Sequence, residues 1–297
     1  RDLHSFPTRR SSDLVGVPYE KVAEFTLNPV SDIELDLAVA SVIVNGETIM
    51  HGANVYTVPL AQPLRIVQSN PHVTTSNYIK IMGTARAGAI EIKKLNIKNT
   101  DDAATIPAGI SVYSDTELKL QDENGIDERG MDEHCGIFVD TGATLTISGD
   151  GGLIAKGGSK ASGIGDSAGG AAVGNIVIES GNIEAHGGSL AAGIGSSRQV
   201  SGGSITVKDG LVKAYGGHLA AGMGAGYESK KMNIRIEGGD VFAEGGEGAA
   251  GITGGESAAG SGILITGGTV KSKPGGAHNA ITPPTRSEER RVGKECR

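Results

Sequence analysis

Three ring side chains recur at nearly even intervals in the second half of the chain: His186, Tyr215 and Phe242. An aromatic pair on a flat protein face can stack against an apolar ring face, such as that of a sugar. We therefore predict Tyr215, Phe242 and His186 as candidate ligand-binding residues for a polysaccharide or surface glycan. Isolated aromatic residues on an ordinary solvated surface are the competing interpretation.

Carboxylates are densest between Asp122 and Glu133. Hard cations such as calcium take six to eight oxygen ligands, often from acidic loops. We expect the run from Asp122 to Glu128 to be a loop, and the candidate calcium ligands are Asp122, Glu123, Asp127 and Asp132. Because their spacing matches no EF-hand, a solvated polar loop without calcium is the alternative.

Other reactive residue types lack the patterns that catalysis needs. Sugar-cleaving enzymes hold two carboxylates at a defined separation, and we find no Asp pair and no Asp, Arg and Lys trio in register. Cys135 occupies a slot that equivalent segments fill with Ala or Ser, which predicts a buried packing role. No glycine-rich segment leads into a helix or a Gly-Lys-Ser/Thr motif, which excludes a phosphate cradle. We expect no enzymatic activity.

Composition narrows the class of protein. The 297 residues include 48 glycines, two cysteines and no tryptophan. This glycine content is about twice ordinary usage, yet far below the one-third that collagen requires. The net charge of −7 argues against nucleic-acid partners, which need Lys and Arg to neutralise phosphates. No apolar run approaches the ~18 residues of a membrane span, so we expect no membrane insertion.

The two ends differ from the rest of the chain. A coding sequence for residues 286–297, when reverse-complemented and read one base out of frame, encodes Leu3–Leu14. This relation resembles a translated sequencing adapter, so we set residues 1–14 and 286–297 aside as artefactual tails. The remaining residues 15–285 carry a net charge of −10 and one cysteine, Cys135, which excludes an internal disulfide.

The candidate residues lie within an internal repeat. Short apolar pairs that begin with Ile recur at a constant step, at Ile176, Ile205, Ile234 and Ile263. Apolar residues alternate with period two inside each copy, which is typical of strands. Glycines mark the corners, where a positive φ is needed. Three short strands per copy predict an all-β protein, a single-stranded right-handed parallel β-helix of about 29 residues per coil over residues 65–285.

Stacked copies should align their outward residues in columns. One column alternates in charge: Glu179, Lys208 and Glu237. A second contains Glu184, Lys213, Phe242 and Lys271, and a third contains Lys156, His186, Tyr215, Glu244 and Lys273. Opposite charges on adjacent strands contribute about 0.2–1 kcal/mol each, so a charge-balanced solvated face explains the first column.

The segment that precedes the repeat is poorer in glycine. Asp32–Leu37 and Ser41–Val44 alternate, and the turn pair Asn45-Gly46 follows. Because a bare solenoid end exposes unpaired backbone groups, we predict that residues 15–64 form a β-rich N-terminal cap and the first coils. Pro283-Pro284 marks the end of the repeat, where we expect an uncapped edge.

Specific strings carry a family resemblance. Residues 142–158 read GATLTISGDGGLIAKGG, and Ala-Gly-Ile-Gly motifs follow. This pattern resembles the glycine-rich β-helix repeat proteins of bacterial cell surfaces over about residues 60–285, and more loosely a β-helical carbohydrate-binding domain family. The first resemblance implies a β-helix fold and an extracellular or cell-surface location. The looser one implies binding of calcium and acidic polysaccharides, although no ligand residue carries over.

Three functions follow from this sequence. The leading expectation is a non-enzymatic binding or adhesive module for glycans. The second is a stiff stalk of about 40 Å that displays another domain. The third is a polysaccharide lyase or hydrolase, which would release products from a sugar polymer.

Overall fold

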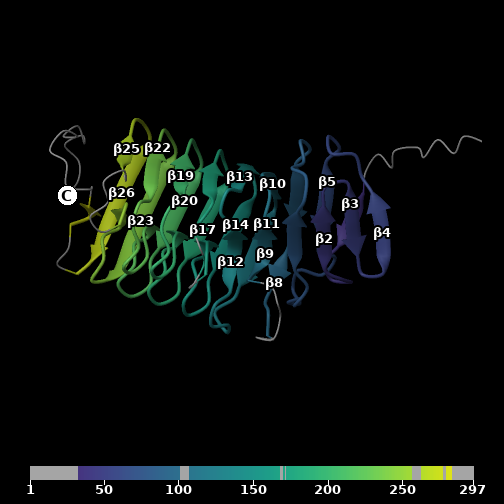
Figure 1. Cartoon of the computed structure of the whole chain (residues 1–297), viewed down its shortest axis with the longest axis horizontal. Coiled ribbons are helices and arrows are strands. Elements are labelled where there is room, and N and C mark those ends of the chain that lie inside the picture. The colour runs from purple at the N-terminus through teal and green to yellow at the C-terminus, as the bar shows by residue number, and fades with distance from the viewer. Residues whose placement is uncertain are drawn as a thin grey trace, which may run out of the picture.

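A computed structural model describes residues 33–100, 107–167, 170, 172–255, 262–276 and 279–282. Both predicted tails lie outside these ranges, as do residues 15–32 of the predicted cap and the Pro283-Pro284 pair. Every described element is a strand, and the strands stack side by side along one long axis (Figure 1). Within these ranges we find no helix with the length and apolar character needed to span a membrane.

Each full coil contributes one strand to each of three sheets, which we name A, C and B in chain order. Sheet A contains β1 (Glu34–Asp36), β5 (Leu64–Val67), β7 (Ile90–Lys93), β10 (Thr116–Gln121), β13 (Thr144–Gly149), β16 (Asn175–Ile178), β19 (Ser204–Val207), β22 (Asn233–Ile236) and β25 (Ile263–Ile265). Sheet C contains β8 (Asn96–Ile97), β11 (Glu123–Asp127), β14 (Gly152–Lys156), β17 (Asn182–His186), β20 (Leu211–Tyr215), β23 (Asp240–Glu247) and β26 (Thr269–Gly275).

Sheet B is the longest of the three. It contains β4 (Asn54–Thr57), β3 (Thr48–His51), β2 (Val42–Asn45), β6 (Ile79–Met82), β9 (Ala108–Val112), β12 (Cys135–Val139), β15 (Ile164–Gly165), β18 (Ile194–Gly195), β21 (Met223–Gly224), β24 (Ile252–Thr253) and β27 (Ile281–Thr282). From β2 to β27 its strands pair in parallel.

The register confirms the predicted fold class. Ile205 pairs with Ile176 on one side and with Ile234 on the other, and Ile234 pairs with Ile263. The step of the sequence repeat is therefore the step between neighbouring coils, about 29 residues. The protein is an all-β parallel solenoid of about 8 turns.

Inward residues build a single continuous core. In the coil of β19, β20 and β21, Ile205, Val207, Val212, Ala214 and Met223 are all 0% exposed. Burying a side chain of Val or Ile stabilises the fold by roughly 1.5–3 kcal/mol. Because a coil has no second layer of its own, this burial depends on the coils above and below.

Sheet B has glycine at the outward position of β15, β18 and β21, whereas β24 has Thr253 there. Gly195 and Gly224 have φ values of +131° and +115°. A Cβ at either residue would lie 2.0 Å from a carbonyl oxygen of the next coil. The Ala-Gly-Ile-Gly motif thus permits close contact between coils, which explains why glycine recurs there.

The N-terminal end of sheet B is antiparallel. β3 pairs with β2 through the predicted turn, where Gly46 has a φ of +58°, and β4 pairs with β3. The buried guanidinium of Arg86 donates hydrogen bonds to four backbone carbonyls, those of Gly46, Val58, Pro59 and Gln62. Burial lowers the pKa of Arg86. Arg86 thereby fastens the antiparallel strands to the first coils.

The prediction of an acidic loop at residues 122–128 is wrong. Residues 123–127 form β11 and pair in parallel with β14. Asn124 and Ile126 point inward and are buried, whereas Glu123, Gly125 and Asp127 face outward. The alternation of a strand, with period two, therefore outweighs the acidic composition.

Candidate functional site

The outward face of sheet C brings the predicted ring residues together. His186 on β17 pairs directly with Tyr215 on β20, and Lys213 pairs with Phe242 on β23. The ring centroids of His186 and Tyr215 lie 4.6 Å apart, and those of Tyr215 and Phe242 lie 5.8 Å apart. We name His186, Tyr215 and Phe242 the aromatic cluster.

The rings of the cluster face one another. The planes of His186 and Tyr215 differ by only 12°, at a centroid separation close to the spacing of about 4.8 Å between strands. Rings lying flat on the sheet would overlap at this separation, so both rings stand with an edge toward solvent. Phe242 is tilted by 54° to Tyr215, and its neighbour on β26 is Lys271, which has no ring. Phe242 and His186, whose other neighbour in register is Lys156, therefore each have a ring neighbour on one side only.

Charged residues surround the cluster. His186 Nε2 lies 2.8 Å from Glu184 Oε1, and Lys273 Nζ lies 2.5 Å from Glu244 Oε1. Burial, followed by the negative charges of Glu184 and Glu244, raises the pKa of Tyr215. Three lysines of this face form no ion pair with any residue that the structure describes: Lys156, Lys213 and Lys271.

Two exposed apolar side chains share this face. Ile154 on β14 is 38% exposed and Leu211 on β20 is 36% exposed. Leu211 occupies the same strand as Tyr215, and Ile154 lies in the same column as Glu184, Lys213 and Phe242. The face thus combines rings, aliphatic groups and lysines, of which Lys156 lies beside Asp127 and Lys213 beside Glu184 in register.

The structure separates the four predicted calcium ligands. Asp122 and Asp127 lie just before and at the end of β11, about 16 Å apart along an extended strand. Glu123 is an exposed outward residue of the same strand, and Asp132 belongs to the segment that leads to β12. Among the described residues no group of three or more His, Cys, Asp or Glu could hold a metal ion.

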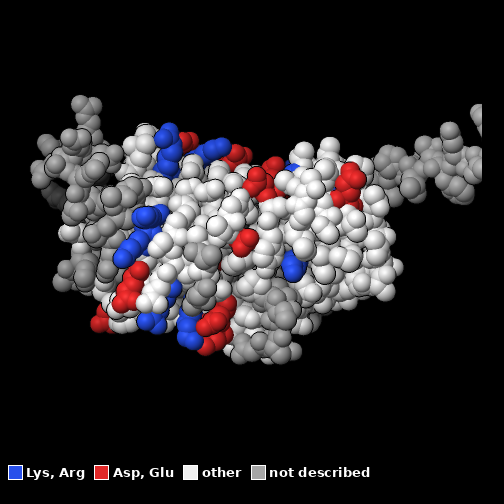
Figure 2. All heavy atoms as spheres, viewed as in Figure 1, with Lys and Arg blue, Asp and Glu red and all other residues white. Residues whose placement is uncertain are grey.

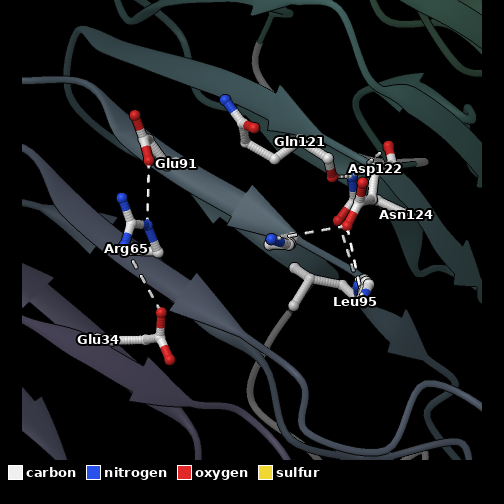
Figure 3. Close-up of polar contacts among 9 residues, drawn as sticks. Glu34, Arg65, Glu91, Leu95, Gln121, Asp122 and Asn124 are labelled. Carbon is white, nitrogen blue, oxygen red and sulfur yellow. Dashed lines mark hydrogen bonds and ion pairs between the residues drawn. The ribbon is translucent and has the colours of Figure 1, made fainter.

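Three of these carboxylates have a cation partner instead. Asp122 Oδ2 lies 3.7 Å from Lys93 Nζ and 3.8 Å from Lys94 Nζ, beside Asn124 in Figure 3. Arg129 pairs with Asp127 at 2.7 Å and lowers its pKa, as Lys160 does for Asp132 at 2.8 Å.

A buried acid escaped the sequence analysis. Glu128 is 0% exposed, and its Oε1 accepts a hydrogen bond of 2.9 Å from Asn99. Its Oε2 lies 3.8 Å from His134 Nδ1, and burial raises the pKa of Glu128 to about 7. The signal was present, because Glu128 continues the inward alternation of Asn124 and Ile126.

Two further buried groups lie near this acid. Asp166 is 0% exposed, its Oδ1 accepts a hydrogen bond of 2.6 Å from the amide of Ser197, and burial raises its pKa to about 7. Cys135 packs against Ala108 and Ala161 and is fully buried, which raises its pKa and confirms the predicted packing role.

Sheet A presents the predicted charge column, which is longer than the repeat suggested. Register extends it toward the N-terminus to give Glu34, Arg65, Glu91, Lys119, Ser148, Glu179, Lys208 and Glu237. Figure 3 shows Arg65 between Glu34 and Glu91, at 3.7 and 3.2 Å. On the face seen in Figure 2, acidic and basic side chains are interspersed and neither sign forms a continuous patch.

Comparison with known proteins agrees with this architecture. The family model of the beta helix repeat matches residues 176–198 and 201–227, which cover parts of two consecutive coils. No curated protein and no solved structure is detectably similar to the chain. The match and the stacked parallel sheets both support a β-helix repeat architecture.

Proposed function

We propose that this protein is a non-enzymatic β-helix module, extracellular or at the cell surface, that binds a polysaccharide through sheet C. The supporting observation is the gathering of three rings on consecutive strands, with centroids 4.6 and 5.8 Å apart, beside three lysines without an ion-pair partner among the described residues. The fold by itself does not decide the function, because one fold hosts many activities.

Each group on this face has a distinct part in binding. The side of Phe242 away from Tyr215 packs against the apolar face of a sugar ring. The hydroxyl of Tyr215 donates and accepts hydrogen bonds, as sugar hydroxyls do. Lys213 and Lys271 flank Phe242 in its column and donate to hydroxyl or carboxylate oxygens of the ligand.

Binding without cleavage fits the carboxylates of this face. Glycoside hydrolysis uses an acid and a second carboxylate at a defined separation across the scissile bond. Glu184 is engaged by His186 and Glu244 by Lys273, and the two glutamates lie two coils apart. We therefore favour a binding module over a lyase or hydrolase.

Co-sedimentation of residues 15–285 with cellulose, chitin, xylan, agarose, alginate and polygalacturonate gels tests this proposal. We expect selective retention on at least one polymer, and a loss of about tenfold in affinity when Tyr215→Ala and Phe242→Ala are combined. The matched control is Tyr113→Ala, which removes a similar ring pair with Phe138 on sheet B, at 5.6 Å. Equal retention of the double variant and the wild type would exclude this site.

Two further readouts separate the alternatives. Release of reducing or unsaturated sugars from the retained polymer would identify a hydrolase or lyase. Repeating the sedimentation with a calcium chelator tests the calcium prediction independently, since a calcium-dependent site would lose the polymer.

A stiff spacer is the second candidate, and the continuous ladders favour it. The charge column of sheet A crosses eight strands, from β1 to β22. About eight turns at the spacing between strands give a rod of about 40 Å. The spacer predicts no retention on any polymer.

A further inference from the structure

The direction of the ligand can be read from the arrangement of side chains on sheet C, and this reading rests on the proposed polysaccharide site. We infer that the bound chain lies along the solenoid axis, crossing β14, β17, β20 and β23, and does not follow a single strand. In this orientation the polymer contacts Ile154, which lies outside the aromatic cluster.

Along the axis, each of four successive coils supplies one ring or aliphatic group, and these groups alternate between two neighbouring columns. Ile154 on β14, His186 on β17, Tyr215 on β20 and Phe242 on β23 supply one such group on each of four successive coils. At a spacing of about 4.8 Å per coil, this axial strip is about 14 Å long. A polymer lying on it meets a ring or an aliphatic side chain at every coil.

Along the strands, the same groups are isolated by polar residues. On β23 the outward neighbours of Phe242 are Asp240 and Glu244, and on β17 those of His186 are Asn182 and Glu184. The axial path passes the charged Glu184 and Lys213, but it meets a ring or aliphatic group on each of four coils. A sugar chain following either strand would meet one ring and would cover charged groups that already have partners, such as Glu244 with Lys273. Removing such pairs from water without new hydrogen bonds is unfavourable.

Strand β20 offers the one alternative path among the strands of the cluster. Leu211 and Tyr215 lie on the same outward face, about 13 Å apart, with Lys213 between them. A chain along β20 would contact Leu211 and would never reach Ile154. A chain along the axis would contact Ile154 and leave Leu211 to one side.

The axial strip has two ends, and these set its length. Beyond Ile154 the same column continues with Gly125, and beyond Phe242 it continues with Lys271. The affinity for oligosaccharides should therefore rise with the number of sugar residues until the strip is filled, and then level off.

Ile154 and Leu211 form a matched pair for the test, because they are 38% and 36% exposed on the same sheet. We would titrate Ile154→Glu and Leu211→Glu with oligosaccharides of increasing length, from the disaccharide upward, prepared from the polymer that the wild type retains. We expect Ile154→Glu to weaken binding of the polymer and the longer oligosaccharides about fivefold and to leave the disaccharide unchanged. Leu211→Glu should stay within about twofold of the wild type throughout.

Each other outcome overturns a defined part of the argument. If Leu211→Glu lowered the affinity for the polymer as much as Ile154→Glu, or more, the axial direction would be overturned. The axial direction would also be overturned if polymer binding required Tyr215 and Phe242 but was unchanged by Ile154→Glu. The polysaccharide site itself would then still stand. Failure of the wild type to retain any polymer would remove both proposals. Circular dichroism and thermal unfolding of each variant verify that the fold is retained.

Discussion

The coils before about residue 167 and the coils after it differ in the polar side chains that they bury. In the first region the solenoid buries polar side chains of several kinds, including Gln68, Arg86, Asn124, Glu128 and Asp166. In the second region the buried polar side chains of the described residues are three serines, Ser196, Ser197 and Ser229. Glycine and alanine fill the remaining tight positions there.

Coil length explains this contrast. The glycines that open the sheet B motif recur at unequal steps from Gly109 to Gly193, and then at one constant step to Gly251. Where coils differ in length, backbone groups at the corners lose their partner in the next coil, and a side chain must replace it. Asn124 does so by accepting from the amide of Leu95 and donating to the carbonyl of Gly152. In the identical coils short side chains suffice: Ser196 accepts from the amide of Gly226, and Ser229 donates to the carbonyl of Ser197.

The largest effect should come from Arg86 in the first region. Arg86→Met leaves four carbonyl acceptors without the guanidinium that now bonds them, at 2.7–3.1 Å. We expect a loss of about 4 kcal/mol in the free energy of unfolding, because buried groups without partners are costly. Urea unfolding measures the loss, and hydrogen exchange should localise it to the strands before β7.

Arg65→Met is the control for this substitution. Arg65 also pairs with two partners, Glu34 and Glu91, but on the exposed face of sheet A. We expect a change below about 1 kcal/mol, since exposed ion pairs contribute little. Similar losses for the two variants would show that burial of Arg86 is not what fastens the first region.

The second region should respond most strongly to added volume between coils. A Cβ at Gly217 would lie 1.7 Å from the carbonyl oxygen of Gly188. Gly217→Ala must push two coils apart, and we expect a loss of about 3 kcal/mol in the free energy of unfolding. Thermal and urea unfolding measure it.

Gly142 in the first region is the control for Gly217, because its backbone is left-handed but a side chain there would have free space. It has a φ of +85°, and a Cβ there would meet nothing within 4 Å. Gly142→Ala should therefore lose only about 1 kcal/mol, the cost of a left-handed residue with a side chain. If Gly142→Ala were as damaging as Gly217→Ala, close contact between coils would not be the reason for glycine in the second region.

These two regions also mark how far sequence reasoning extends. The constant step of the later coils predicted that Ile205 pairs with Ile234 and that His186 pairs with Tyr215, because identical coils leave one register. Arg86 belongs to no repeated pattern, so its four carbonyl partners were invisible to a search for periodicity. The orientation of Tyr215 was equally hidden, since a column fixes which residues are neighbours but not how their rings turn.

The next largest difference between the two regions should be the dependence of stability on pH, because the buried acids Glu128 and Asp166 both lie in the first region. Burial raises the pKa of each to about 7, from 4.5 for Glu128 and 3.8 for Asp166. A raised pKa means that the folded state holds its proton longer, so stability is greatest in acid and falls as the pH rises toward 7. Deprotonation of each group should lower the free energy of unfolding by about 2 kcal/mol between pH 5 and pH 7. Urea unfolding across this range measures the slope.

Glu128→Gln tests whether Glu128 causes this pH dependence of stability, and Asp127→Asn is its control. Glu128→Gln should remove about half of it, because the amide has no proton to lose. The pKa of Asp127 is lowered by Arg129, so its contribution to stability is lost only as the pH falls below 3.8. Asp127→Asn should therefore keep most of the slope between pH 5 and pH 7 and reduce it only slightly, because the Asp127 charge is the smallest cause that raises the pKa of Glu128. A flat profile in the wild type would contradict the buried, protonated state of Glu128.

The smallest effect should come from the charge column of sheet A, which runs through both regions. Lys208 in the second region has Glu179 on one side, at 2.8 Å, and Glu237 on the other, whereas Lys119 in the first region lies between Glu91 and the neutral Ser148. At low salt, Lys208→Glu should lower the urea midpoint of unfolding and Lys119→Glu should lower it about half as much, because like charges on adjacent strands repel. Both decreases should shrink in 1 M salt, where the screening length falls to about 3 Å. A decrease that is independent of salt would mean that the methylene stems of these lysines, and not their charges, stabilise the column.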